Sequence, residues 1–388
     1  MKTKNKIPEA LELSEAIAQA VRQCNVDVIT SYPITPQTHI VEKLSKFNAN
    51  GKLKAEFVNL ESEHSSMSAC IGASASGSRV FTATSSQGLM YMAEMLPIAS
   101  GLRLPIVMVN ANRAISAPIN IWNDHSDSMF VRDSGWIQIY CESVQEAYDT
   151  LIQAYRIAEN KQISLPIMLC IDGFSLSHVM ENISLSGDKE VAMFVGKFSP
   201  TRKLESKNPK TLGHVASPKD YYLFKQEQVG AIENSLNEIK KANSDFSQKF
   251  KRKYGDGLIE EYNLKNAETV FIALGSICST IKGLINENKF GKSKVGLLRI
   301  KTFRPFPKKE IEKIISNNKI KKIIVVDRSN SFGSNNPVYS EIKQLDYLCL
   351  NKKETKNFVL GLGGKNITDG EFIEIVNNFN KFKEVNIL

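Results

Sequence analysis

The stretch Ser31-Tyr-Pro-Ile-Thr-Pro-Gln-Thr38 decides the fold of this chain. It follows an apolar run at 26–30 that is typical of a buried parallel strand. Pro33 keeps the residue before it extended, and Pro36 suits the first turn of a helix predicted at about 37–47. Such a stiff strand-to-helix crossover lies at the carboxyl end of a strand, where open α/β sheets bind their ligands. The two prolines alone indicate only a rigid turn, so other stretches must decide its role.

Strands and helices alternate through the first half of the chain. Helices are predicted at 9–25, 37–47, 62–77, 85–100 and 144–160, and strands at 26–30, 54–59, 80–84, 104–110 and 166–171. This alternation indicates the α/β class, with a parallel sheet covered by helices on both faces. A loop-like stretch at 111–135 interrupts the pattern and carries Arg113.

The alternation pauses after about residue 183. Residues 184–220 are polar and contain three prolines, and 220–254 has the spacing of a long helix. A second α/β pattern then begins, with strands predicted at 269–274, 295–300, 322–327 and 358–361. We therefore predict two α/β domains, at 1–183 and 267–388, separated by an extended linker and long helix at 184–266.

Composition narrows the class of protein. The net charge of +9 is mild for 388 residues, and no basic motif interleaved with aromatic residues points to nucleic acid. No apolar run reaches the length of a membrane span, and the first residues carry no secretory signal, so we expect a cytoplasmic protein with no membrane partner. The six cysteines are scattered, which excludes Cys-x-x-Cys metal sites. We predict no metal site on this chain, so a redox metal would have to lie on another one.

Several stretches together resemble one family. They are Tyr32-Pro-Ile-Thr-Pro36, Glu61-Ser-Glu-His-Ser-Ser-Met67, Thr84-Ser-Ser-Gln-Gly-Leu89, and Asn112-Arg-Ala-Ile-Ser-Ala-Pro-Ile-Asn-Ile-Trp122 running into Asp124-His-Ser-Asp127. The chain resembles the alpha subunits of multi-subunit pyruvate:ferredoxin oxidoreductases (pyruvate synthases), within the 2-oxoacid:ferredoxin oxidoreductases. The resemblance covers nearly the whole length, and Leu298-Arg-Ile-Lys-Thr-Phe-Arg-Pro-Phe306 resembles the family's transketolase C-terminal-like domain.

The resemblance implies a fold, cofactors and partners. Residues 1–183 would form a thiamine-diphosphate-binding domain of the pyrimidine type, and 267–388 the transketolase C-terminal-like domain. Thiamine diphosphate would be shared with a beta subunit that holds its diphosphate through Mg²⁺. Iron–sulfur clusters would lie on the partners, which include gamma and delta (ferredoxin-like) subunits. Coenzyme A would be a substrate and ferredoxin the electron acceptor.

The resemblance also implies roles for individual residues. Glu63 matches the glutamate that hydrogen-bonds the aminopyrimidine ring and promotes proton transfer through it. Thr35 and Arg113 match the pair that contacts the substrate, because a guanidinium can bind the carboxylate of a 2-oxoacid. Pro33 and Ile34 would lie against the cofactor. Residues 85–88 and 120–127 would shape the pocket.

Without the resemblance, each of these residues has an ordinary structural explanation. Glu63 could simply stabilise a helix N-terminus, and Glu61 would be an equal candidate for an acid–base role. Arg113 could form a surface salt bridge, and the Thr35 hydroxyl could cap a turn. It is the order of several motifs that favours the functional interpretation.

The implied reaction is the reversible, coenzyme A-dependent oxidative decarboxylation of pyruvate to acetyl-coenzyme A and carbon dioxide. Two alternatives stay open. The same chemistry could act on branched-chain 2-oxoacids, although Ser116-Ala-Pro-Ile-Asn120 is more similar to the pyruvate enzymes. Alternatively, the chain could be a non-catalytic scaffold subunit of such a complex.

Three further motifs are weak. Gly255-Asp-Gly257, with Asn286 after it, is similar to a magnesium-diphosphate motif, but a charged helical tail precedes it, so we predict a helix stop. Gly361-Leu-Gly-Gly364 follows a strand and could cradle a phosphate, although its spacing fits no dinucleotide motif. Asp124-His-Ser-Asp127 is more typical of a turn that hydrogen-bonds itself than of a metal site.

Overall fold

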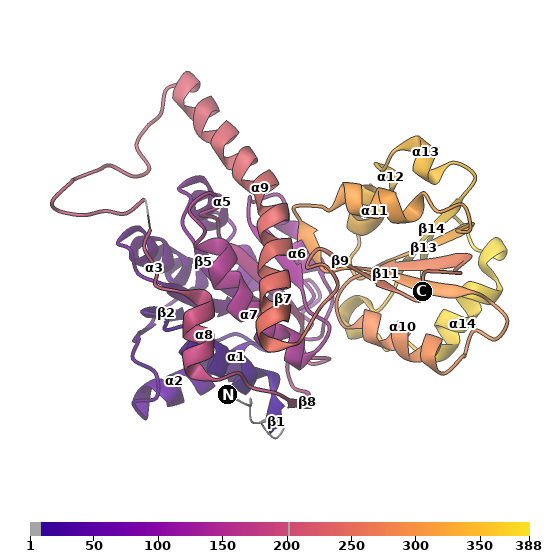
Figure 1. Ribbon diagram of the computed structural model, residues 1–388, viewed down its shortest axis with the longest axis horizontal. Helices are drawn as coiled ribbons and strands as arrows, with labels where there is room; N and C mark the ends of the chain where they lie inside the picture. The colour runs from indigo at the N-terminus through magenta and orange to yellow at the C-terminus, as the bar shows by residue number, and fades with distance from the viewer. Residues whose placement is uncertain (1–8, 201) are drawn as a thin grey trace.

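The computed structural model describes residues 9–200 and 202–388. Two large sheets lie side by side, each flanked by helices, and a long helix runs along the first (Figure 1). The α/β class predicted from the sequence is confirmed. No helix of the described residues is long and apolar enough to cross a membrane.

The first sheet holds seven strands in the order β12-β6-β7-β5-β4-β2-β3. Neighbouring strands from β6 to β3 are parallel, and β12 is antiparallel to β6. The strands, in chain order, are β2 (Val28–Ser31), β3 (Glu56–Asn59), β4 (Val80–Thr84), β5 (Ile106–Asn112), β6 (Ile137–Tyr140), β7 (Ile167–Asp172) and β12 (Thr302–Arg304). The chain passes from β2 to β3 on one side and then to β4 on the other. The direction of winding therefore reverses between β2 and β4, which is where α/β sheets form a crevice at their carboxyl edge.

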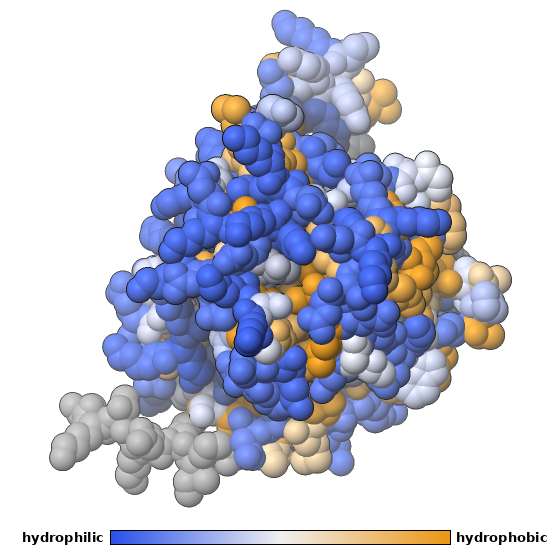
Figure 2. All heavy atoms as spheres, turned by 90° about the vertical axis from the view of Figure 1, so that its right-hand side faces the viewer, coloured by the Kyte–Doolittle hydropathy of each residue, from blue (hydrophilic) through white to orange (hydrophobic). Residues whose placement is uncertain are grey.

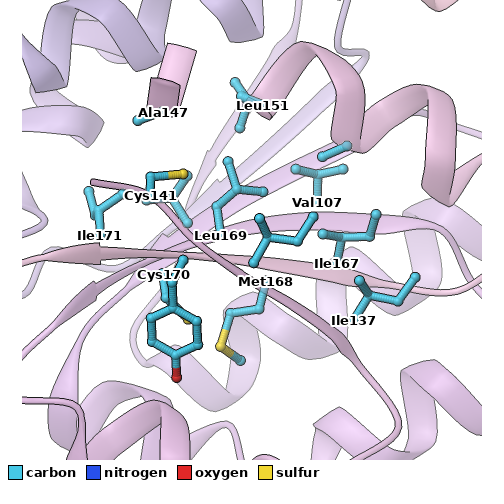
Figure 3. Packing of buried hydrophobic residues seen from close by; sticks show 14 of the residues in the cluster. Val107, Ile137, Cys141, Ala147, Leu151, Ile167, Met168, Leu169, Cys170 and Ile171 are labelled. Atoms are coloured by element: carbon cyan, nitrogen blue, oxygen red, sulfur yellow. The ribbon is translucent and has the colours of Figure 1, made fainter. Parts of the chain in front are cut away.

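The helices around this sheet are α1 (Leu13–Gln23), α2 (Thr38–Ala49), α3 (Glu63–Ala75), α4 (Ser86–Tyr91), α5 (Met95–Gly101), α6 (Ser126–Phe130) and α7 (Val144–Ala158). Side chains of β5, β6 and β7 pack with Ala147 and Leu151 of α7 in the core (Figure 3). The single helix predicted at 85–100 is instead two, because Pro97 lacks an N–H and fits only the first turn of a new helix, α5.

The connection between the sheets is more ordered than the sequence suggested. After β8 (Met180–Ile183), which pairs with β1 (Glu9–Glu12), an unexpected helix α8 (Asp188–Val195) forms inside the stretch predicted to be extended. It buries Val191, Phe194 and Val195 at helical spacing. The long helix α9 (Pro218–Phe250) follows; its amino-terminal half projects from the body (Figure 1), while Phe246 near its other end packs on Phe194 with ring centroids 5.3 Å apart.

The second sheet has six strands in the order β15-β14-β13-β10-β11-β9. The strands are β9 (Ile259–Tyr262), β10 (Thr269–Ala273), β11 (Val295–Ile300), β13 (Lys322–Asp327), β14 (Glu354–Val359) and β15 (Val385–Ile387). The helices are α10 (Ile277–Asn286), α11 (Lys308–Ile315), α12 (Pro337–Lys343), α13 (Tyr347–Leu350) and α14 (Asp369–Asn377), with short 3₁₀ turns η1 (Leu362–Gly364) and η2 (Phe379–Lys381). The outer face of this part is mainly hydrophilic, with small hydrophobic patches (Figure 2).

The two halves interlock. Strand β9 lies before residue 267 yet joins the second sheet, and β12 lies beyond it yet joins the first. Arg299 of β11 is fully buried, and its Nη2 donates to Glu146 Oε2 of α7 at 2.6 Å and to the carbonyl of Tyr140 at 3.0 Å. The division at residues 183 and 266 stays a prediction, because strands cross it in both directions.

Candidate active site

The residues singled out from the sequence leave the carboxyl ends of neighbouring parallel strands. Thr35 follows β2, Glu63 follows β3 and Arg113 follows β5, with β4 between β2 and β5. Because parallel strands end at the same edge of a sheet, the fold brings three residues far apart in sequence to the crevice where the winding reverses.

Glu63 is the first residue of α3 and is only 7% exposed. The preceding Ser62 caps the helix, its hydroxyl accepting a hydrogen bond from the Ser65 N–H at 3.1 Å. Among the described residues, no other residue donates a hydrogen bond to the Glu63 carboxylate, and burial raises its pKa. Glu61, its competitor on sequence grounds, is exposed and accepts from the Ser65 hydroxyl. Glu63 is therefore the better placed acid–base group.

Gly88 of α4 makes room for this carboxyl group. A Cβ at residue 88 would lie 2.6 Å from Glu63 Oε1 and 2.6 Å from Thr84 Oγ1. That Thr84 hydroxyl is buried and has no hydrogen-bond partner in the described chain. A side chain at residue 88 would therefore displace Glu63. The Glu63 carboxylate and the Thr84 hydroxyl are both left to form hydrogen bonds with a molecule outside this chain.

Arg113 and Thr35 lie in contact, because the Arg113 side chain binds the backbone carbonyl of Thr35 and not its hydroxyl. Arg113 is 7% exposed; its Nη1 donates to the Thr35 carbonyl at 2.9 Å and its Nε to the Asn120 carbonyl at 2.7 Å. Its Nη2 makes no hydrogen bond within the described residues, so one edge of the guanidinium is available to a ligand. Thr35 and Pro33 are exposed and Ile34 is half-buried, so all three are accessible at the same edge.

A buried carboxylate from the stretch 120–127, which was predicted to shape the pocket, organises the loops around Arg113. Asp127 is fully buried, and its Oδ2 accepts from the backbone N–H of Arg113 at 3.1 Å and of Ser86 at 3.0 Å. It also accepts from Asn110 and Asn112 at the end of β5, at 3.1 and 2.8 Å. Burial raises its pKa to about 6 despite these hydrogen bonds. Asp127 thus links the end of β5 to the start of α4.

A signal for Asp127 was present in the sequence. Asn110 and Asn112 alternate at the end of an apolar strand, so their amides share one face and need buried acceptors. The predicted self-bonded turn is also there, because Asp124 Oδ1 accepts from the Ser126 N–H at 2.9 Å. Ser86 has a left-handed φ of 47°, which for a residue other than glycine is a sparsely populated conformation that clusters at functional sites.

In the two weak glycine motifs, Gly255-Asp-Gly257 and Gly361-Leu-Gly-Gly364, polar groups form hydrogen bonds with other groups of this chain. Asp256 Oδ1 accepts from the N–H groups of Leu258 and Ile259, both at 2.9 Å, and so stabilises the turn into β9. The helix before it ends at Lys251, which is left-handed, rather than at the glycine. In the other motif, the Gly363 N–H donates to Asp124 Oδ2 at 3.0 Å. Across the described ranges there is no group of three or more His, Cys, Asp or Glu residues that could hold a metal ion.

Two family profiles match the chain. One, described as pyruvate flavodoxin/ferredoxin oxidoreductase, thiamine diphosphate-binding, matches residues 19–244, and the other, pyruvate:ferredoxin oxidoreductase core domain II, matches residues 267–372.

Curated relatives extend over almost the whole chain. It is 48% identical to pyruvate synthase subunit PorA of Methanocaldococcus jannaschii, over 96% of this chain and 94% of that one. It is 44% identical to PorA of Thermotoga maritima, over 91% and 90%. Identity to ketoisovalerate oxidoreductase subunit VorA of Pyrococcus horikoshii is 39%, over 98% and 95%.

A solved structure shares the fold. It is 2-oxoglutarate:ferredoxin oxidoreductase from Magnetococcus marinus with 2-oxoglutarate, coenzyme A and succinyl-CoA bound. The TM-score is 0.73 at 19% identity, and the match covers 96% of this chain but 65% of that one. The present chain therefore spans about two thirds of the longer polypeptide with the same architecture.

Proposed function

The chain belongs to the pyruvate:ferredoxin oxidoreductase family, and from this premise we propose that it is the alpha subunit of a multi-subunit pyruvate synthase. The family resemblance drawn from the sequence is confirmed. In the reaction, pyruvate and coenzyme A give acetyl-coenzyme A, carbon dioxide and a proton, and two electrons pass to ferredoxin. The observation that carries this proposal is the convergence of a buried, unpaired Glu63 and a buried Arg113 with one open edge at the same sheet crevice.

The crevice fits the aminopyrimidine half of thiamine diphosphate. A ring of this kind needs an acid–base partner at N1′ and polar partners beside it. Glu63 and the unpaired Thr84 hydroxyl supply the polar groups, and the absence of a side chain at Gly88 leaves room for the Glu63 carboxyl group beside them. Bound thiamine diphosphate supplies a nucleophilic carbon for the 2-oxo group and accepts the electrons released when carbon dioxide leaves.

In this proposal Glu63 exchanges a proton with N1′ of the pyrimidine ring. Burial favours the protonated carboxyl and raises its pKa, which brings it nearer the pH at which proton transfer in both directions is efficient. General acid–base catalysis of this kind contributes a factor of roughly 100 to 10,000.

Arg113 binds the carboxylate of pyruvate in this proposal. Its Nε and Nη1 are fixed by the Asn120 and Thr35 carbonyls, so the unpaired Nη2 is held in one direction. A fixed guanidinium orients the carboxylate that leaves as carbon dioxide. The Thr35 hydroxyl is assigned to an oxygen of the substrate, and Pro33 and Ile34 to the surface that faces the cofactor.

A partner subunit would complete the site. Large apolar side chains in the segments that follow β2 and β5 are exposed in this chain: Ile119 is 80% exposed, Trp122 52% and Tyr32 36%. Exposed apolar side chains of this size are typical of a surface that another protein covers. We assign the diphosphate and its Mg²⁺ to a beta subunit, and the iron–sulfur clusters to gamma and delta subunits. A cytoplasmic location stays a prediction from the sequence.

Pyruvate is favoured over branched-chain 2-oxoacids as the substrate because PorA of Methanocaldococcus jannaschii is 48% identical to this chain, whereas VorA of Pyrococcus horikoshii is 39% identical. The test is to co-express the chain with its partner subunits and compare turnover of pyruvate and 2-oxoisovalerate, then repeat it with Glu63→Gln. We expect preference for pyruvate and loss of turnover in the assembled variant. Preference for 2-oxoisovalerate would overturn the substrate, and full activity of Glu63→Gln would favour the scaffold alternative.

A further inference from the structure

Resting on the role proposed above for Arg113, we propose that the glycine turn Gly361–Gly364 of the second domain is a positioning element for that arginine, acting through Asn120. The turn follows β14 and contains η1. It contacts the arginine loop, defined here as residues 113–126, which follows β5. No other chain is needed for this contact.

The link runs through a continuous set of hydrogen bonds. Asn120 Nδ2 donates to the Gly363 carbonyl at 2.9 Å, and the Gly363 N–H donates to Asp124 Oδ2 at 3.0 Å. The second domain therefore forms hydrogen bonds with two residues of the loop, Asn120 and Asp124. The Asn120 carbonyl in turn accepts from Arg113 Nε at 2.7 Å, and Arg113 Nη1 reaches the Thr35 carbonyl at 2.9 Å. The position of Asn120 thus sets the position of the guanidinium.

The arginine loop needs such a support because its own hydrogen bonds hold only its base. The Ala114 N–H donates to the Trp122 carbonyl at 3.0 Å and the Ile115 N–H to Ser126 Oγ at 3.1 Å, which closes the base of the loop. The tip is unsupported, since residues 117–119 are exposed. Asn120 lies between the tip and the closed base, where a contact from outside the loop fixes the direction of the Arg113 acceptor.

The glycines of the turn permit this close approach. Gly363 has φ of +56°, and a Cβ there would lie 2.7 Å from Asn120 Nδ2; a Cβ at Gly364 would lie 2.3 Å from Trp122 Cβ. A side chain at either position would push the arginine loop away from the second domain. Glycine is thus required here for contact between the domains and not for binding a phosphate.

The test uses the assembled enzyme with Asn120→Ala, Gly363→Ala, Arg113→Lys and the double variant Asn120→Ala/Arg113→Lys. The matched control is Gly291→Ala, because Gly291 has a similar φ of +59° but nothing within 4 Å of the position of a Cβ. We expect the first two variants to lower kcat/KM for pyruvate by roughly 5- to 100-fold with KM for coenzyme A unchanged, and the control to match wild type. The double variant should be no worse than Arg113→Lys, because Asn120 acts through Arg113.

A second readout does not depend on turnover. In the isolated full chain Trp122 is 52% exposed whereas Trp136 is 1% exposed, so acrylamide quenching of its tryptophan fluorescence reports mainly on the arginine loop. We expect stronger quenching in Gly363→Ala than in Gly291→Ala. The inference is wrong if Asn120→Ala and Gly363→Ala stay within twofold of wild type while Arg113→Lys is impaired, if the double variant is additive, or if Gly291→Ala behaves like Gly363→Ala. If Arg113→Lys itself retains wild-type KM and kcat, the role of Arg113 fails instead.

Discussion

Adding one methyl group at Gly88 should disable the site without disturbing the fold. In Gly88→Ala the new Cβ would lie 2.6 Å from Glu63 Oε1 and 2.8 Å from Glu63 Cγ. Because both atoms are too close, rotating the carboxylate does not relieve the clash, and the whole side chain must move. Reaching an ordinary contact of 3.4 Å requires a displacement of about 0.8 Å from the original 2.6 Å.

A displacement of this size has a large effect on catalysis. Misplacing a catalytic group by about 1 Å costs roughly 100-fold in rate, which corresponds to about 2.7 kcal/mol of activation free energy. The helix should tolerate the change, because alanine is favoured over glycine in a helix by about 1 kcal/mol. We therefore expect kcat to fall roughly 100-fold in Gly88→Ala while the midpoint of thermal unfolding changes little.

The assay is the initial rate of pyruvate oxidation by the assembled enzyme at saturating coenzyme A and thiamine diphosphate, with a low-potential dye as electron acceptor. Gly283→Ala is the control, since Gly283 also lies in a helix, α10, and a Cβ there would contact nothing within 4 Å. The control should keep full activity. Turnover by Gly88→Ala within twofold of wild type would refute the reasoning, because Glu63 could then move without consequence and would not be the acid–base group.

The other predictions concern the charged groups. Arg113→Lys should raise KM for pyruvate in steady-state kinetics, because lysine does not reproduce the guanidinium fork; an unchanged KM and kcat would exclude the carboxylate role. Protonation of Asp127, whose pKa is raised to about 6 by burial, removes an acceptor from the N–H of Arg113, so kcat/KM should fall as pH drops through about 6, and Asp127→Asn should abolish that step. Since this folded-state pKa lies above the unfolded one, the same titration should make Asp127 cost stability as pH rises from about 4 to 6. Arg299→Ala leaves buried Glu146 unpaired on one side and should lower the free energy of unfolding by about 3–5 kcal/mol in denaturant titrations; a loss below about 1 kcal/mol would contradict this.

Local patterns in the sequence were enough to predict the strands that carry the site. Apolar runs followed by turn residues located β2, β4, β5 and β7, and the strand-end positions of Thr35 and Arg113 followed from them. The choice between Glu61 and Glu63 did not follow from spacing, because both lie at the start of the same helix. Burial separates them, and burial depends on α4 packing against α3 through Gly88, a contact between residues 25 positions apart.

Such local patterns could not predict contacts between segments that lie far apart in the sequence. Strand β12 is three residues long and has no partner near it in sequence, so its pairing with β6 depends on the second domain being folded. Asp127 lies in a stretch predicted to be a loop, and its role as acceptor for two loops and a strand end needs all three in place. The glycines of Gly361–Gly364 are compatible with a phosphate cradle in sequence, because the loop that contacts this turn, through Asn120 and Asp124, lies far away along the chain.

Residues of the second sheet and its loops therefore contact the loops that carry the candidate site. Beyond the glycine turn, Asp172 at the end of β7 accepts from Arg328 Nη1 at 2.9 Å and from the Ser276 N–H at 2.9 Å, both beyond β9 in the chain. Asp172 also contacts His125 of the arginine loop at 2.7 Å; although burial opposes ionisation of Asp172, His125 and Arg328 hold its pKa below the ordinary value. The loops after β5 and β7 are thus fixed by residues of the second sheet. A fragment ending before β9 would keep Glu63 and Arg113 in sequence but would lose the contacts that orient the arginine.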